Sequence, residues 1–262
     1  MSVQRIKAII LQELYITKHS LEVIIDLFYF SVITIIVFGL VSVYLAGTNN
    51  PLSAQYILVG MILWEIIRVT QYSISVGALW NIWSRNLSNM FVAPLTLSEY
   101  MLATMIAGMI KTGIILVLIS TIAAFLFGFN ILNIGIVNLL LALVNLTIFA
   151  WSVGIIILAV IFRYGTRIQA LAWGLVFLFQ PLTAAFFPVS ILPEPLRTLA
   201  YVFPPTYVFE AARIGLINPS VNWNAMGISF VQNIIYLILS LWFFNYMFNK
   251  SKDIGQFAKN EG

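Results

Sequence analysis

The sequence predicts an all-α integral membrane protein with six transmembrane helices. Of its 262 residues, 61% are hydrophobic and only 8% are charged, whereas a soluble domain carries roughly 25% charged residues. So few charges cannot cover a water-facing surface, and lipid must therefore contact most of this chain. Apolar stretches of about 20 residues, the length that a helix needs to cross a bilayer, recur along it. We expect a single transmembrane domain over residues 1–262.

Residues 1–23 are expected to form a cytoplasmic interfacial helix. Charged residues are spread through this segment, and no clean apolar run precedes a small-residue cleavage site, so a signal peptide is not expected. Apolar residues fall on one face at helical spacing, and these are Val3, Ile6, Ile10 and Leu14. An ordinary lead-in helix in the cytoplasm is the alternative interpretation.

Six apolar stretches follow, separated by turn-rich or charged segments. We expect spans one to five within residues 24–188, span six within 225–248, and a cytoplasmic tail over 249–262. The individual stretches cover residues 27–46, 56–82, 100–127, 136–162, 168–187 and 226–248.

The distribution of Lys and Arg predicts the orientation, because cytoplasmic segments carry an excess of both. With the N-terminus inside, the outer segments hold only Arg197 and Arg213. Both termini of this multi-pass chain are therefore expected on the cytoplasmic side of the cell membrane. The net charge of +4 is explained by the same bias and requires no nucleic-acid partner. The cytoplasmic segments hold Arg5, Lys7, Lys18, Arg85, Arg163, Arg167, Lys250, Lys252 and Lys259.

A short amphipathic helix is expected on the cytoplasmic side between spans two and three. Leu87, Met90 and Phe91 form a small apolar face at helical spacing. Thr96 and Glu99 then match a capping box that would start the next helix. A helix of this kind suits docking into a groove on a partner, and a helix that rests on lipid headgroups is the alternative.

Residues 189–222 are expected to form a helical hairpin that enters the outer leaflet and returns. Seven of the nine prolines lie in or just before this segment, and proline breaks helices, yet its aromatic and aliphatic content is too high for a loop. Non-helical backbone at membrane depth is tolerated only where protein buries it or where it lines a cavity. One helix would follow Pro193 and the other would follow residues 204–206, with Glu210 and Arg213 paired at i, i+3. An extracellular loop with an interfacial helix is the alternative.

Polar residues inside the predicted spans are a further candidate site. A charged side chain at the bilayer centre costs roughly 2.5–3.5 kcal/mol, so Glu65, Arg68 and Lys111 require an explanation. In a functional interpretation, these three residues line a polar route through the membrane. A structural interpretation pairs Glu65 with Arg68 or with Lys111, away from lipid. Gln71 adds a polar point to either arrangement.

Motifs for nucleotide binding and catalysis are missing. The sequence contains no G-x-x-x-x-G-K-[ST] loop, no G-x-S-x-G or H-E-x-x-H motif, no cysteine and a single histidine. We therefore expect no enzyme activity, no metal site and no cofactor bound by this chain.

Taken together, these features resemble the permeases of type-2 ABC exporters. The most specific pieces are FVAPLTLSEY at 91–100 and FFPVSILPEPLRTLAYVFPPTYVFEAARIGL at 186–216. Their order and their placement relative to six spans strengthen the resemblance, which extends over nearly the whole chain.

The resemblance implies a half-transporter. A second permease copy, with a homodimer favoured, would complete the pathway among membrane lipids, and a cytoplasmic ABC ATPase dimer would hold ATP and Mg²⁺. The resemblance implies that the ATPase docks on a coupling helix that contains Arg85, Asn86, Leu87, Asn89, Met90, Phe91 and Pro94. It also implies an outer re-entrant gate that contains Pro188, Pro193, Pro204, Pro205, Tyr207, Glu210 and Arg213.

The expected cargo is a hydrophobic or amphipathic molecule such as a drug, an antibiotic or a lipid-like compound. Permeases of this kind for polysaccharides often begin span one with a Gly- and Trp-rich signature, which residues 19–39 lack. A lipid-linked polysaccharide or teichoic acid is the first alternative. An ion-coupled secondary transporter that uses Glu65, Arg68 and Lys111 is the second, and a non-transporting scaffold or lipid enzyme ranks last.

Overall fold

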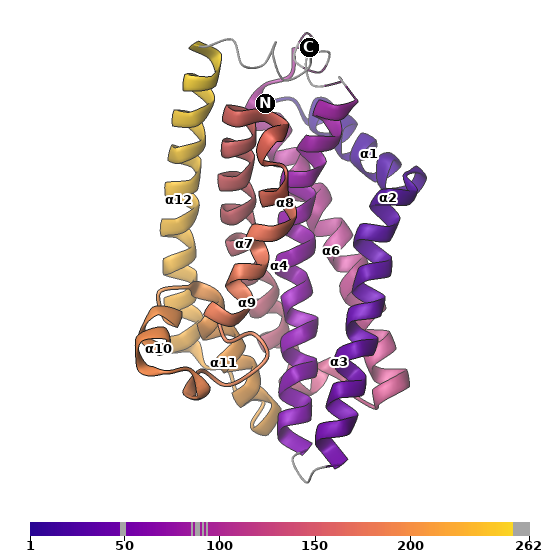
Figure 1. Ribbon diagram of the computed structural model, residues 1–262, viewed down its shortest axis with the longest axis vertical. Coiled ribbons are helices and arrows are strands. Elements are labelled where there is room, and N and C mark those ends of the chain that lie inside the picture. Colours follow the sequence, from indigo (N-terminus) through magenta and orange to yellow (C-terminus); the bar gives the residue numbers. More distant parts are fainter. Residues whose placement is uncertain (48–50, 85, 87–89, 91, 93, 254–262) are drawn as a thin grey trace.

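The computed structural model describes residues 1–47, 51–84, 86, 90, 92 and 94–253, and this part of the chain consists of helices and turns without a strand. Figure 1 shows long helices that run side by side, with α1 crossing one end of the bundle. The all-α prediction is confirmed.

Within the described residues, five helices are long and apolar enough to cross a membrane. They correspond to predicted spans one to four and six, and the last of them extends beyond the predicted residues 225–248. The first consists of α2 (Leu21–Ile24), a π turn (Ile25–Tyr29) and α3 (Phe30–Gly47). The others are α4 (Pro51–Trp83), α6 (Leu97–Phe127), α7 (Ile136–Tyr164) and α12 (Trp223–Asp253).

The predicted fifth span, 168–187, is not one continuous helix, so the prediction of six continuous spans is not confirmed. Pro181 has no N–H to donate to a helix, and Ala184 takes a positive φ of 51°, which ends helical geometry. In Figure 1 the broken run still leads from the end of the bundle where α7 finishes toward α10 and α11 near the other end. It consists of α8 (Ala170–Gly174), a 3-10 turn (Leu175–Leu178) and α9 (Phe179–Leu182).

A helix forms at the N-terminus as predicted, and it is α1 (Val3–His19). It packs against α6 and buries Ile9, Glu13 and Thr17. Glu13 pairs with the buried Lys111 of α6, whereas Val3 is 80% exposed. The interfacial placement of this helix remains a prediction.

The segment before α12 forms two short helices, α10 (Glu194–Ala200) and α11 (Pro204–Ile217). Pro193 precedes α10 as expected. The second helix starts at Pro204 rather than after residues 204–206, because proline fits the first helical turn, where no N–H partner is needed. The placement of this hairpin as a re-entrant element in the outer leaflet remains a prediction.

The capping box at the start of α6 is confirmed. The backbone N–H of Glu99 donates to Thr96 Oγ1 at 3.3 Å, and the backbone N–H of Thr96 donates to Glu99 Oε2 at 2.9 Å. The same carboxylate also accepts from the backbone N–H of Ser2 at 2.6 Å and pairs with Arg5 at 3.1 Å. One glutamate thus starts α6 and holds the beginning of α1 against it.

Helix α4 is the centre of the bundle, where it packs against α3, α6 and α7. Every residue from 58 to 79 is buried except Arg68, which is partly buried. A helix that is covered on all sides must satisfy its polar side chains internally. Thr70 does so by a hydrogen bond of 2.8 Å to Thr112 of α6.

The backbone of α4 comes close to the turn that follows α9. A Cβ atom at Gly60 would overlap the carbonyl oxygen of Ala185. Because that contact is with backbone, no side-chain rotation can relieve it. Glycine at this position therefore allows the broken segment to lie directly on α4.

We expect Gly60→Ala to lower stability by about 1–3 kcal/mol, the usual cost of overpacking a filled interior. Thermal unfolding of the purified protein in mild detergent measures the effect as a lower midpoint. Gly113→Ala is the matched control, because no atom lies within 4 Å of the added methyl group and alanine favours a helix. Equal midpoints for the two variants would contradict the close approach.

Candidate functional site

The first span contains a π turn at the depth where α4 carries its charged residues. In this turn the N–H of Phe30 bonds to the carbonyl of Ile25, five residues earlier. A π turn departs from the regular i→i+4 ladder, and such turns are frequent at functional sites. Here the carbonyls of Asp26 and Leu27 accept hydrogen bonds from a side chain on another helix.

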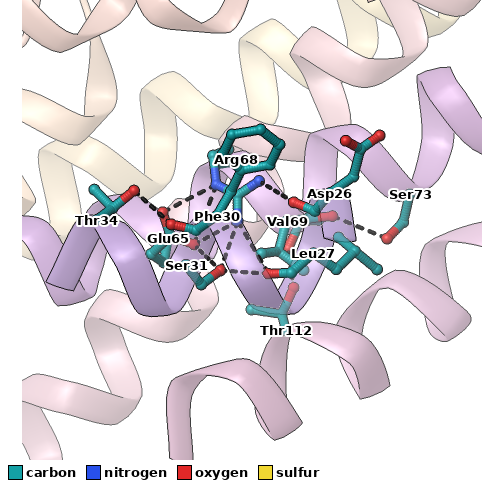
Figure 2. Close-up of polar contacts among 11 residues, drawn as sticks. Asp26, Leu27, Phe30, Ser31, Thr34, Glu65, Arg68, Val69, Ser73 and Thr112 are labelled. Carbon is teal, nitrogen blue, oxygen red and sulfur yellow. Dashed lines mark hydrogen bonds and ion pairs between the residues drawn. The ribbon is translucent and has the colours of Figure 1, made fainter. Parts of the chain in front are cut away.

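That side chain is Arg68, near the middle of α4 (Figure 2). Its Nη1 donates to the carbonyl of Asp26 at 3.1 Å, and its Nη2 donates to the carbonyl of Leu27 at 3.4 Å. Its Nη2 also lies 2.7 Å from Glu65 Oε2, and its Nε lies 2.9 Å from Glu65 Oε1. The hydroxyl of Ser31 lies 2.6 Å from both the Arg68 Nη2 and the Glu65 Oε2. The structure therefore places Glu65 and Arg68 in the ion pair that the structural interpretation expects.

A second polar group lies beside this pair. Asp26 Oδ2 accepts a hydrogen bond from the Tyr72 hydroxyl at 2.8 Å and another from Trp173 Nε1 at 3.4 Å. Gln71 donates to the carbonyl of Ala172 at 3.0 Å. The Gln71 bond joins α4 to α8, and the two Asp26 bonds join the π turn to α4 and to α8.

These groups surround a pocket of about 240 Å³ between α3, α4 and the broken segment. The pocket contains Glu65, Arg68 and Gln71 from the predicted site, and it adds Asp26, which sequence reasoning left in the lead-in to span one. The only sequence signal for Asp26 was a carboxylate at the start of an apolar stretch. The pocket is lined by Asp26, Phe30, Thr34, Met61, Trp64, Glu65, Arg68, Gln71, Tyr72, Ala172, Trp173, Val176, Phe177 and Gln180.

Lys111 belongs to a different group. Its Nζ lies 3.1 Å from Glu13 Oε2 of α1, and both side chains are buried. The suggested pairing of Lys111 with Glu65 is therefore wrong. Sequence reasoning missed Glu13 because its partner lies 98 positions away, a separation that no local pattern reports.

The predicted coupling helix is described only in part. Arg85, Leu87, Asn89 and Phe91 lie outside the described residues. The N–H of Asn86 bonds to the carbonyl of Asn81 at 2.9 Å, Pro94 is exposed, and Val92 is 86% exposed. Met90 is buried against Ile9, Tyr100 and Ala103, so this residue packs inward, toward α1 and α6.

The predicted gate residues lie together at the end of the bundle opposite α1. Arg213 Nη1 lies 2.6 Å from Glu210 Oε1, and Arg213 Nη2 donates to the carbonyls of Ala184 and Ala185. The same Glu210 oxygen accepts from the N–H of Val189 at 3.0 Å. Burial lowers the pKa of Arg213, and the charge of Glu210 offsets only part of this effect.

The other gate residues shape the backbone of the same region. Pro188 and Pro193 stand immediately before short helical turns, and Pro204 and Pro205 form the start of α11. The ring of Tyr207 packs against Tyr201 with centroids 5.3 Å apart. The predicted gate is thus one packed unit, and its gating role remains a prediction.

No group of three or more His, Cys, Asp or Glu side chains that could hold a metal ion occurs within the described part of the chain. Five ion pairs join acidic and basic side chains among the described residues.

A family model described as ABC-2 type transporter matches residues 5–217. A search of curated proteins found no match. The matched residues contain most of α1, the pocket, the partly described segment after α4, and the helices α10 and α11.

The Glu65–Arg68 pair generates a prediction about stability. We expect Glu65→Gln and Arg68→Gln each to cost about 3–5 kcal/mol, because each leaves a buried charge without its partner. The double variant should recover much of this loss. Unfolding free energies in bicelles, combined in a double-mutant cycle, measure the coupling.

Glu194 and Arg197 supply the control, since they form an ion pair with the same i, i+3 spacing on the exposed face of α10. Exposed pairs contribute little, so the same cycle on this pair should give little coupling. Equal coupling in the two cycles would mean that burial of Glu65 and Arg68 carries no energetic weight.

Proposed function

The chain belongs to the ABC-2 type transporter family, and from this premise we propose that it is the membrane subunit of an ATP-driven exporter. Members of this family are the permease component, and membership implies an ABC ATPase as partner. The family match over residues 5–217, together with the apolar helices of the bundle, carries the proposal. ATP and Mg²⁺ would be held by the partner, and this chain would hold no cofactor.

In the proposed orientation the chain lies in the cell membrane, and both of its termini are on the cytoplasmic side. Figure 1 places α1 and the last turns of α12 at the same end of the bundle. That end carries Lys18 in the last turn of α1 and Lys250 and Lys252 in the last turn of α12. A cytoplasmic excess of positive charge supports this orientation.

The proposed docking surface for the ATPase is the segment between α4 and α6. Val92 offers an exposed apolar side chain there, while Met90 anchors the same segment to α1 and α6. An exposed apolar side chain on a segment that is anchored to the bundle is suited to insertion into a groove on a partner. A movement of the ATPase at this surface would reach α4, α1 and α6 together.

The proposed outer gate is the unit formed by α10 and α11. Arg213 holds the turn at Ala184 and Ala185, and Ala185 lies on α4 at Gly60. The gate is therefore attached to the central helix. A rocking motion of α4 would move it, which supports closure of the outer end of a pathway between two permease copies.

The proposed cargo is hydrophobic or amphipathic and moves outward from the cytoplasm or the inner leaflet. The pocket supports this class, because aromatic and aliphatic side chains form most of its wall and a few polar groups converge in it. A lipid-linked polysaccharide or teichoic acid remains the alternative cargo. An ion-coupled route finds less support, because Glu65–Arg68 and Glu13–Lys111 form two separate pairs.

We expect Val92→Asp to abolish co-purification with the ABC ATPase subunit, because a charge would replace the exposed apolar contact. The test co-expresses the chain with ABC ATPase subunits of its source organism and measures the captured ATPase. Leu132→Asp is the control, since Leu132 is 53% exposed in the turn between α6 and α7. Full ATPase capture by Val92→Asp would contradict the docking role.

We also expect Thr198→Cys to react with a membrane-impermeant maleimide in intact cells, because Thr198 lies exposed on α10. Lys18→Cys on α1 should react only after the cells are permeabilised. The chain has no cysteine, so each variant carries a single reactive thiol. Labelling of Lys18→Cys but not of Thr198→Cys in intact cells would reverse the proposed orientation.

A further inference from the structure

The carboxylate of Asp26 faces the pocket without an ion-pair partner among the residues that the structure describes. Its two donors, the Tyr72 hydroxyl and the Trp173 indole, are neutral groups. They orient the carboxylate and leave its charge uncancelled. Arg68 contacts the backbone carbonyl of Asp26, and its ion pair is with Glu65.

The pocket therefore carries an excess of negative charge. Its acidic and basic lining residues are Asp26, Glu65 and Arg68, so two carboxylates face one guanidinium. Arg68 is already occupied, because its Nε, Nη1 and Nη2 are each hydrogen-bonded. An anionic ligand would have to displace these bonds, whereas a cation would meet an unpaired carboxylate.

Aromatic rings form much of the wall of the pocket, and they are Phe30, Trp64, Tyr72, Trp173 and Phe177. The faces of aromatic rings attract cations, and cages of such rings recognise ammonium groups. A carboxylate beside several rings is thus a combination suited to an organic cation. An apolar ligand would leave the charge of Asp26 unpaired, and the described residues contain no group of three or more His, Cys, Asp or Glu side chains that could hold a metal ion.

We propose that this pocket binds the ammonium head of an amphipathic organic cation. The inference rests on the proposed export function and names the class of cargo for it. A volume of about 240 Å³ lies below the roughly 300–1,000 Å³ of pockets that enclose a drug-sized molecule. The pocket therefore takes the head of the molecule, and the apolar remainder lies outside it.

The test measures binding of radiolabelled phenyltrimethylammonium to the full chain in nanodiscs, without ATPase or ATP. Two unlabelled competitors, tert-butylbenzene and benzenesulfonate, share its phenyl ring and head shape but are neutral and anionic. We expect saturable binding that only unlabelled phenyltrimethylammonium displaces. Equal displacement by tert-butylbenzene would overturn the proposal.

Three variants locate the binding. Asp26→Asn keeps the size of the side chain and removes its charge, so the affinity should fall about tenfold. Phe177→Leu removes one aromatic wall and should weaken binding about threefold. Glu22→Gln removes an exposed carboxylate on neighbouring α2 and should change nothing. Affinity that is unchanged in both Asp26→Asn and Phe177→Leu would place the cation elsewhere.

The lipid of the nanodisc distinguishes two sources of the cationic head. If choline lipids occupy the pocket, they compete with the probe, so its affinity for the wild type should be lower in phosphatidylcholine than in phosphatidylglycerol. The affinity of Asp26→Asn should then differ less between the two lipids. Equal ratios for the two proteins identify a non-lipid cation. Both outcomes keep the cation site, and absence of saturable binding in either lipid rejects it.

The experiment is independent of assembly with the ATPase. Loss of ATPase capture with intact cation binding would reject the docking role alone. Intact capture without cation binding would reject the cargo class alone.

Discussion

The fold depends on one constraint, which is that a charge buried in a lipid-embedded bundle must find a partner. Three buried or partly buried cations satisfy it in the same way. Arg68, Lys111 and Arg213 each pair with a glutamate. Arg68 and Arg213 also bind backbone carbonyls of another segment, and Lys111 reaches α1 through Glu13 itself. Each cation therefore ties together two parts of the chain that apolar contact alone would leave free to slide. Dispersion forces between aliphatic side chains have little preference for register, whereas these pairs have a single geometry.

The sequence alone predicted the features that depend on neighbouring residues. The apolar stretches located five of the long helices, the Thr96–Glu99 spacing predicted a capping box, and the prolines marked the two short helices near residues 194–217. Features that depend on distant partners were not accessible to periodicity. The partner of Glu13 is Lys111, which lies 98 positions away in the sequence and therefore outside any local pattern. The fifth span read as continuous because residues 168–187 are apolar, and composition does not report the 3-10 turn at Leu175–Leu178.

The pocket shows why local irregularity and binding occur together. A regular helix keeps its carbonyls for its own N–H groups, and the π turn at Ile25–Tyr29 makes two of them available to Arg68. The opposite wall is the broken run from α8 to α9, where 3-10 geometry weakens the backbone bonds. A ligand in this pocket therefore contacts two irregular segments, the π turn region and the broken run, as well as the continuous helix α4. Small shifts of these walls cost less than shifts of intact helices.

Helix α4 also joins the pocket to both ends of the molecule. Asn81, in its last turns, accepts at its backbone carbonyl from the N–H of Asn86 beyond the helix. Gly60, in its first turns, supports the turn at Ala185. Helix α1 is fixed to α6 at Glu99 and again at Lys111, and it leads through α2 directly into the π turn. Arg68 belongs to α4, whereas the π turn follows α1, which is anchored to α6. A displacement of α4 relative to α1 and α6 must therefore change the contact between Arg68 and the π turn. The Arg68 contact is therefore sensitive both to the position of α4 relative to α1 and α6 and to the contents of the pocket.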